Sequence, residues 1–217
     1  MCERAADKRD IWALILAGGA SWRMGQPKLL LPAPHGNLLK QTVHQALAAA
    51  NVRVAVIAPK DGPLRREHVD GLPVEWLTTT RADRGLGASL AAGIRQLEEC
   101  HSPSAVLILL GDQPEISPEA IRQVAEAFIH TGAGIVQSRY DDRPAHPVLF
   151  AAQLFPKLMA LDGDAGAKEL LHLYQDHLYS VRIPGKAPRD IDTPEEYERY
   201  RLTVFSKVDF EEETRYP

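Results

Sequence analysis

Short apolar runs alternate along the chain with longer segments in which apolar residues recur every three or four positions. The runs are typical of strands buried on both faces, and they cover Ile11–Ala17, Val52–Ala58, Val74–Leu77, Ala105–Leu110, Gly134–Ser138, Pro147–Phe150 and Leu178–Ile183. The longer segments predict helices near Leu38–Ala50, Ala88–Cys100, Gln153–Leu161 and Gly166–His172, and two more that begin in the capping sequences at Ser117 and Thr193. Repeated strand–helix–strand units predict a single-domain three-layer α/β/α sandwich around a mostly parallel, Rossmann-like sheet.

The two ends of the chain are more polar than its centre. We assign residues 1–10 to a polar N-terminal tail, 11–203 to one domain and 204–217 to an acidic C-terminal tail that is exposed or disordered. The net charge of −4, without a long basic stripe, argues against a nucleic-acid surface, and no apolar run approaches the roughly 20 residues of a membrane span. The polar start lacks the apolar core of a secretory signal, and Cys2 and Cys100 form no C-x-x-C pair. We therefore expect a cytoplasmic protein with reduced thiols.

The segment 11–31 carries the most specific chemistry. Its apolar strand runs into Gly18-Gly19, where backbone N–H groups are open to a phosphate, and Arg23 and Lys28 add positive charge within the same loop. The spacing fits neither G-x-G-x-x-G nor the Gly-Lys-Ser/Thr of a P-loop, which argues against a nicotinamide-binding domain. The loop instead predicts a triphosphate cradle. The plainer alternative is a turn with two solvated basic residues.

Carboxylates at two other places suit a metal ion. Asp112 follows the apolar strand Ala105–Leu110 directly, and Asp190 and Asp192 precede the last helix. A triphosphate near Asp112 requires a cation between them, and Mg²⁺ (or Mn²⁺) takes one or two carboxylates together with phosphate oxygens. If the segment is extended, Asp190 and Asp192 face the same side. The alternative for all three is ordinary turn or capping chemistry.

The loop at residues 16–28 (LAGGASWRMGQPK), followed by GDQP at 111–114 and DIDTP at 190–194, resembles the MobA-like nucleotidyltransferase family. The resemblance covers about residues 11–200, and within the family the chain is most similar to molybdenum cofactor cytidylyltransferases. Further matching segments are GLGASL at 85–90, RPAHPVLF at 143–150 and GDAGAK at 163–168. The family implies the three-layer fold of nucleotide-diphospho-sugar transferases and a Mg²⁺-dependent transferase of the EC 2.7.7 type.

The resemblance also assigns roles to individual residues. The nucleobase would be lined by Leu16, Ala17, Gly18 and Gly19. The triphosphate would be held by Arg23 and Lys28, and the ribose would lie at Gly85 and Ser89. Asp112 with Asp192 or Asp190 would bind the metal, and the acceptor would face His146, Pro147, Asp164 and Lys168. Arg23, Lys28 and Asp112 would be the catalytic set. The implied reaction moves a nucleoside monophosphate to molybdenum-bound molybdopterin and releases pyrophosphate, with a molybdoenzyme or its chaperone as the partner protein.

Several alternatives stay open. Gly18 is closer to guanylyl-transferring relatives, whereas the later motifs favour CTP, and Ala145 stands where the family more often has Gly. A sugar or polyol phosphate is another possible acceptor, and a non-catalytic molybdenum-cofactor chaperone is the rival outside enzymes. His146 could be a packed residue, Lys168 a solvated one, and Ser89 the cap of the helix after it.

Overall fold

The computed structural model describes residues 10–18, 25–163, 167–175 and 178–213, and within them one seven-stranded sheet forms the centre of the molecule. Its strand order is β5-β4-β1-β6-β8-β7-β9. The bounds are β1 Ile11–Leu16, β4 Arg53–Pro59, β5 Val74–Thr79, β6 Ala105–Leu110, β7 Ile135–Arg139, β8 Pro144–Ala151 and β9 Leu178–Arg182. A separate small ribbon pairs β2 (Pro32–Ala33) with β3 (Gly36–Asn37). Every strand predicted from the apolar runs is present.

The sheet is parallel except at one strand. β8 pairs antiparallel with both β6 and β7, whereas the pairs β1–β4, β1–β6, β4–β5 and β7–β9 are parallel. The chain between β7 and β8 is only residues 140–143, which is enough for a hairpin but too short for the crossover that a parallel pair requires. The predicted mostly parallel sheet is confirmed, and this short connection explains its exception.

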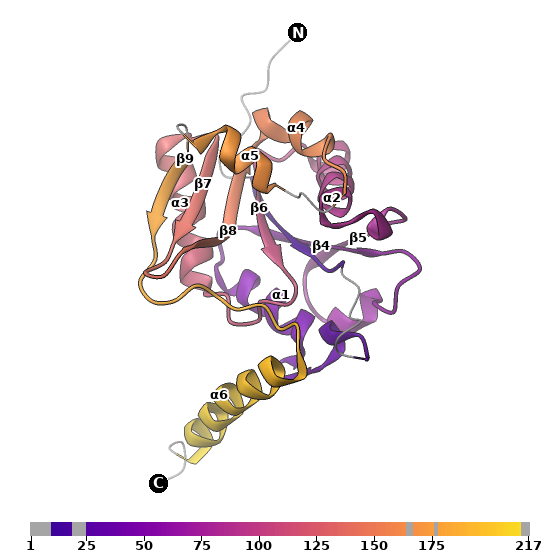
Figure 1. Cartoon of the computed structure of the whole chain (residues 1–217), viewed down its shortest axis with the longest axis vertical. Helices are drawn as coiled ribbons and strands as arrows, with labels where there is room; N and C mark the ends of the chain where they lie inside the picture. The colour runs from indigo at the N-terminus through magenta and orange to yellow at the C-terminus, as the bar shows by residue number, and fades with distance from the viewer. Residues whose placement is uncertain (1–9, 19–24, 164–166, 176–177, 214–217) are drawn as a thin grey trace.

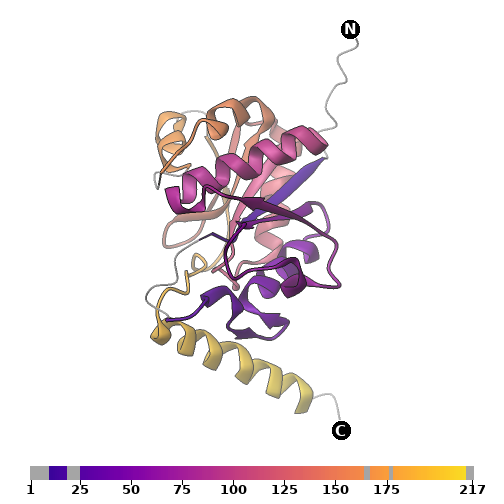
Figure 2. The ribbon, with the colours of Figure 1, turned by 90° about the vertical axis from the view of Figure 1, so that its right-hand side faces the viewer.

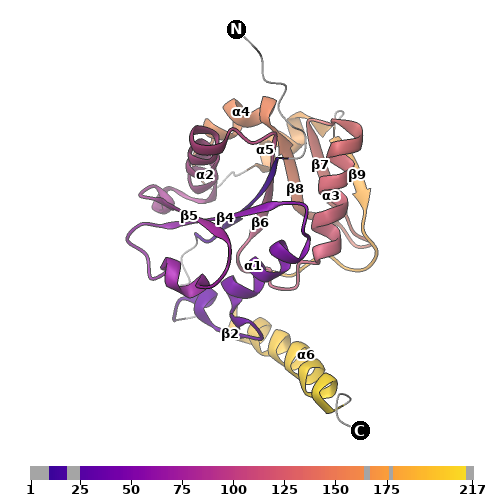
Figure 3. The ribbon, with the colours of Figure 1, turned by 180° about the vertical axis from the view of Figure 1, so that it is seen from behind.

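Helices cover both faces of the sheet and complete the three layers (Figures 1 and 3). α1 (Leu38–Ala48) and α3 (Pro118–Thr131) lie on one face, and α2 (Leu86–His101), α4 (Phe155–Met159) and α5 (Lys168–Leu173) lie on the other. Side chains of β1 alternate between the two cores: Ile11, Ala13 and Ile15 join the first, and Trp12, Leu14 and Leu16 the second. Short 3₁₀ turns occupy Lys28–Leu30 (η2), Arg66–Val69 (η3), Ala82–Arg84 (η4) and Ala152–Leu154 (η5).

The last helix, α6 (Pro194–Glu213), leaves the body of the molecule and points away from the sheet (Figures 1 and 2). The capping sequence predicted at Thr193 is confirmed, because Glu196 Oε2 accepts hydrogen bonds from the backbone N–H groups of Asp192 and Thr193. Tyr197, Tyr200 and Val204 pack its first turns against Leu31, Ala33 and Leu38. The helix runs on to Glu213, so the boundary that we drew at residue 203 falls inside it. No helix in the described part of the chain is long and apolar enough to cross a membrane.

Candidate functional site

The carboxyl ends of β1 and β6 bring the first two motifs together. Gly111, the residue after β6, donates its backbone N–H to the carbonyl oxygen of Leu16 at 3.0 Å. A Cβ atom at Gly111 would lie 3.2 Å from that oxygen and from Leu29 Cδ1, so a larger residue would force the strand ends apart. Thr42 of α1 fixes the same turn, since its buried hydroxyl donates to the Gly111 carbonyl at 3.1 Å. Asp112 therefore starts from a rigidly held backbone.

Lys28 lies between two of the predicted metal-binding carboxylates. Its Nζ atom is 2.6 Å from Asp112 Oδ2 and 2.6 Å from Asp192 Oδ1, and its side chain is only 12% exposed. Burial by itself lowers the pKa of Lys28, but the two carboxylates outweigh burial and raise that pKa above its ordinary value. Burial raises the pKa of Asp112, and the neighbouring Asp190 and Asp192 add to this rise while Lys28 opposes it. Lys28 stays charged in this arrangement and neutralises part of a dense group of acids.

Asp190 and Asp192 do not share a partner. Asp190 Oδ1 accepts a hydrogen bond of 2.7 Å from Gln113 Nε2, whereas Asp192 binds Lys28. Between them, the buried Ile191 donates its N–H to the Asp112 carbonyl at 3.0 Å, which ties this segment to the end of β6. The structure thus brings all three aspartates to one sheet edge but gives the two members of the DID motif different contacts.

The residues present fit a divalent cation. One oxygen of Asp112 and one of Asp192 converge on the Lys28 ammonium, so the protein already directs both carboxylates at a single cationic group. No group of three or more His, Cys, Asp or Glu side chains suited to a metal was found among the described residues. Two carboxylates supplemented by phosphate oxygens and water match the way Mg²⁺ is bound beside nucleotides.

A glycine turn flanks the site at the start of α2. Gly85 has a φ of 111° and occupies the N-cap position of α2, a conformation that favours glycine. Ser89 lies one turn further on, with its hydroxyl 3.4 Å from the Gly85 carbonyl, so the suggestion that Ser89 caps this helix is wrong. A Cβ atom at Gly18 would be 3.3 Å from Ser89 Oγ. Gly18, Gly85 and Ser89, which the resemblance assigns to the nucleotide, are therefore neighbours.

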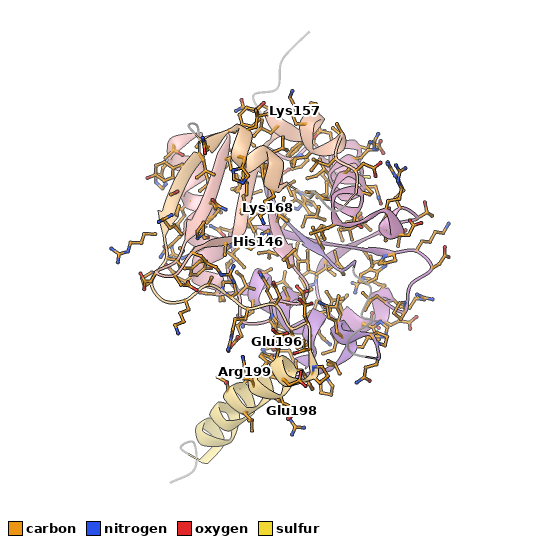
Figure 4. The ribbon with its side chains drawn as sticks, in the orientation of Figure 1. His146, Lys157, Lys168, Glu196, Glu198 and Arg199 are labelled. Atoms are coloured by element: carbon orange, nitrogen blue, oxygen red, sulfur yellow. The ribbon has the colours of Figure 1, made fainter. Side chains whose placement is uncertain are left out.

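His146 and Lys168 line one pocket of about 280 Å³ between β1, β6, β8 and the helices α2 and α5. Figure 4 shows both side chains on the same side of the molecule, well separated from Lys157 on α4. Leu16 lines this pocket too, although the resemblance assigns it to the nucleobase, and most of the remaining lining is apolar. The backbone N–H of Gly87 donates to the Gly163 carbonyl at 2.8 Å, so Gly163 lies against the first turn of α2.

His146 is a structural residue as well as a pocket residue. Its Nδ1–H donates to the Ile108 carbonyl of β6 at 3.2 Å, and its own carbonyl accepts from the Tyr140 hydroxyl at 3.0 Å. Burial lowers the pKa of His146, which favours the neutral ring. The following Pro147 is buried in β8, and the peptide bond between them is cis. Lys168 is exposed at the start of α5.

Three predicted site residues, Gly19, Arg23 and Asp164, lie outside the described residues. Ala17 is buried and its N–H donates to the Ile57 carbonyl at 2.9 Å, so its backbone belongs to the sheet edge. Sequence reasoning missed Gln113 and Thr42. The signal for Gln113 was its position next to Asp112 in the GDQP motif. The signal for Thr42 was a polar residue on the apolar face of an Ala- and Leu-rich helix.

The chain is similar to several known proteins. A family model described as "MobA-like NTP transferase domain" matches residues 13–178. The chain is 29% identical to the purine catabolism protein PucB of Bacillus subtilis, over 88% of this chain and 96% of PucB. It is 24% identical to the molybdenum cofactor cytidylyltransferase of Escherichia coli, over 86% of this chain and 95% of that protein.

Solved structures share the fold. Rv0371c from Mycobacterium tuberculosis matches with a TM-score of 0.77 and 27% identity, covering 88% of this chain and 96% of Rv0371c. Its complex with manganese matches with a TM-score of 0.71 and 26% identity over 88% of this chain and 97% of that one. Because the family model spans well over half of the sequence and the fold agrees, the chain belongs to the MobA-like NTP transferase domain family.

Proposed function

We propose that this protein transfers a nucleoside monophosphate from an NTP, with CTP preferred, to a phosphorylated molybdopterin-type acceptor and releases pyrophosphate. The observation that carries the proposal is the position of Lys28 between Asp112 and Asp192, at the sheet edge where Gly18 and Gly85 also lie. A cationic side chain, two convergent carboxylates and an open glycine backbone are the groups needed to hold a triphosphate with its metal.

The chemistry requires no protein nucleophile. An oxygen of the acceptor phosphate forms a bond to the α-phosphorus, the bond from that phosphorus to the bridging oxygen breaks, and pyrophosphate leaves with the electron pair. Asp112 and Asp192 would hold the divalent cation, which supplies charge neutralisation and polarisation of the phosphoryl group. Lys28 would neutralise charge that builds on the leaving phosphates, with Arg23 assigned the same task by family resemblance. Positioning and electrostatics then provide the catalysis.

The pocket with His146 and Lys168 is the proposed acceptor site. It lies on the α2 and α5 side of the strand ends, and its mixture of apolar walls with an imidazole and an ammonium suits a heterocycle that carries a phosphate. Lys168 would attract the phosphate, and Pro147 and Asp164 complete the acceptor assignment by resemblance. The relative named as a molybdenum cofactor cytidylyltransferase supports a molybdopterin-type acceptor, and with it a molybdoenzyme or its chaperone as the protein partner.

The nucleotide and the reaction can be tested together. The purified protein is incubated with Mg²⁺, each of CTP, GTP, ATP and UTP, and molybdenum-bound molybdopterin, and pyrophosphate release is measured. We expect release with CTP above all, its loss in EDTA and its return with Mg²⁺ or Mn²⁺. Full turnover in the presence of the chelator, or release that does not depend on the molybdopterin acceptor, contradicts the proposal.

A matched pair of variants separates the enzyme from a cofactor chaperone. Asp112→Asn should abolish pyrophosphate release, whereas Asp141→Asn, at an exposed aspartate in the β7–β8 turn whose carboxylate accepts the Gly185 N–H, should not. A chaperone would bind molybdopterin equally well in both variants and release pyrophosphate in neither. That result would replace the transferase assignment with the binding one.

A further inference from the structure

The Lys28 ammonium occupies the position between Asp112 and Asp192 in which these two carboxylates would bind a metal ion. Oxygen ligands lie about 2.0–2.1 Å from Mg²⁺, and here one oxygen from each carboxylate is 2.6 Å from the Lys28 ammonium. An ammonium and a divalent cation cannot both occupy that position. We propose that Lys28 closes the cation site in the nucleotide-free protein, so that the divalent cation enters only together with the triphosphate that draws Lys28 away. This inference rests on the proposed function.

The backbones that carry the two carboxylates are held in place, whereas the ammonium lies at the end of a long side chain. The backbone of Asp112 is held at its carbonyl by the Ile191 N–H, and that of Asp192 by the Glu196 carboxylate that accepts its N–H. Lys28 begins η2, whose backbone hydrogen bonds from Leu30 to Pro27 and from Leu31 to Lys28 fix the main chain. Its four-carbon stem still rotates freely enough to carry the ammonium to a new partner.

The charge balance favours this order of binding. With Lys28 in place, two carboxylates face one positive charge, and a metal ion arriving alone must break two charge-assisted hydrogen bonds to reach them. A metal–nucleotide complex brings phosphate oxygens that accept the displaced ammonium in the same event. The nucleotide therefore compensates for the contacts that the metal removes, and metal binding becomes dependent on the nucleotide.

Manganese binding measures this dependence without any turnover. Free Mn²⁺ is titrated by electron paramagnetic resonance against wild type, Lys28→Met and Lys157→Met, with neither nucleotide nor acceptor present. Lys157 is an exposed lysine on α4, far from the sheet edge, so its variant controls for the loss of one positive charge (Figure 4). We expect Lys28→Met to bind Mn²⁺ about tenfold tighter than wild type or more, and Lys157→Met to match wild type.

The same titration is repeated with CTP, without acceptor. Wild type should then gain about tenfold or more in Mn²⁺ affinity, and Lys28→Met should gain less because its site is already open. Equal Mn²⁺ affinity of wild type with and without CTP overturns the inference, and so does a folded Lys28→Met protein that binds Mn²⁺ no better than wild type. If the variant fails to fold, equal Mn²⁺ affinity of wild type with and without CTP still overturns the inference.

The outcomes also separate this inference from the proposed function. If Mn²⁺ binds wild type with CTP but Lys28→Met shows no gain without it, the closure by Lys28 is wrong and the transferase site stands. If Mn²⁺ binds neither protein even with CTP, GTP, ATP or UTP, the metal–nucleotide site itself is wrong and both proposals fall.

Discussion

Gln113 and Asp190 form a 2.7 Å hydrogen bond that separates Asp190 from Asp192, two residues further along the chain. Gln113 is 3% exposed, and its Oε1 atom has no hydrogen-bond partner among the described residues. The Gln113 side-chain N–H group thus donates to Asp190, whereas Asp192 accepts from Lys28. We infer that Asp192 is the metal-binding member of the pair and that Asp190 acts on the site indirectly, through its hydrogen bond with Gln113.

Asparagine at each aspartate tests this division. Asp192→Asn should lower turnover roughly 10²–10³-fold and require more Mn²⁺, because it removes a charge from the cation site. Asp190→Asn should cost about tenfold or less, in the range of a residue that acts through a neighbour. Pyrophosphate release as a function of Mn²⁺ concentration provides the measurement, and an equal loss in the two variants would show that the hydrogen bond does not separate their roles.

Removal of the Lys28 side chain should affect both activity and stability. Lys28→Ala should lower kcat/KM roughly 10²–10³-fold, as expected for the loss of one preorganised charge at the transition state. Lys28 is mostly buried between two carboxylates, and its loss leaves both without their cationic partner. We therefore expect the free energy of unfolding to fall by about 1–3 kcal/mol. Denaturant titration and steady-state kinetics, with Lys157→Ala as control, check both effects.

The pH dependence of stability should carry a contribution from His146. The folded protein holds the pKa of His146 below its ordinary value of 6.5, so the folded state binds fewer protons than the unfolded state. The stabilisation is full above pH 6.5 and is lost as the pH falls through the interval down to the folded pKa, at up to about 1.4 kcal/mol per pH unit.

His146→Gln should remove that slope. Denaturant titrations between pH 7 and pH 5 compare it with wild type and with His130→Gln, which changes an exposed histidine near the end of α3. If wild type and His146→Gln lose stability in parallel over this range, the histidine does not titrate in the manner that its burial implies.

Substitution of Gly18 tests the nucleotide side of the site. Its new Cβ would lie 3.3 Å from Ser89 Oγ, so the serine hydroxyl has to turn aside by a few tenths of an ångström. Gly18→Ala should weaken CTP binding without abolishing it, and Gly18→Ala combined with Ser89→Ala should recover part of the loss. Competition between labelled nucleotides measures CTP binding by each variant. If the double variant recovers none of the loss, contact with Ser89 is not the cause of the weaker binding.

Wild type in the same competition should prefer CTP over GTP by about tenfold or more. A mismatched base leaves a buried polar group unpaired, at a cost of about 1–3 kcal/mol. A preference for GTP would refute cytidylyl transfer and leave nucleotidyl transfer intact.

The local sequence determined most of the elements. Ile11–Leu16 and Ala105–Leu110 are continuous apolar runs, and a run of that length between polar turns is buried wherever it packs. The capping residues Ser117 and Thr193 predicted the starts of α3 and α6, because the side chain of a cap accepts hydrogen bonds from backbone N–H groups only a few residues away. Ordered motifs likewise indicated the family, since each motif is read within a few neighbouring positions. The small β2–β3 ribbon, the short 3₁₀ turns and the far end of α6 were not predicted, and at the last of these an acidic composition was taken for a tail.

The contacts within the site were decided by the tertiary structure. Lys28 meets Asp112 across 84 positions and Asp192 across 164, and no local pattern specifies a pairing over that separation. Asp190 and Asp192 have identical side chains, and they differ only because Gln113 and Lys28 approach them from different elements. The sequence by itself determined which residues follow the ends of β1 and β6, because strand ends are set by the short-range hydrophobic pattern. Packing of the layers decided which of those groups touch, because that depends on distances that only the folded chain defines.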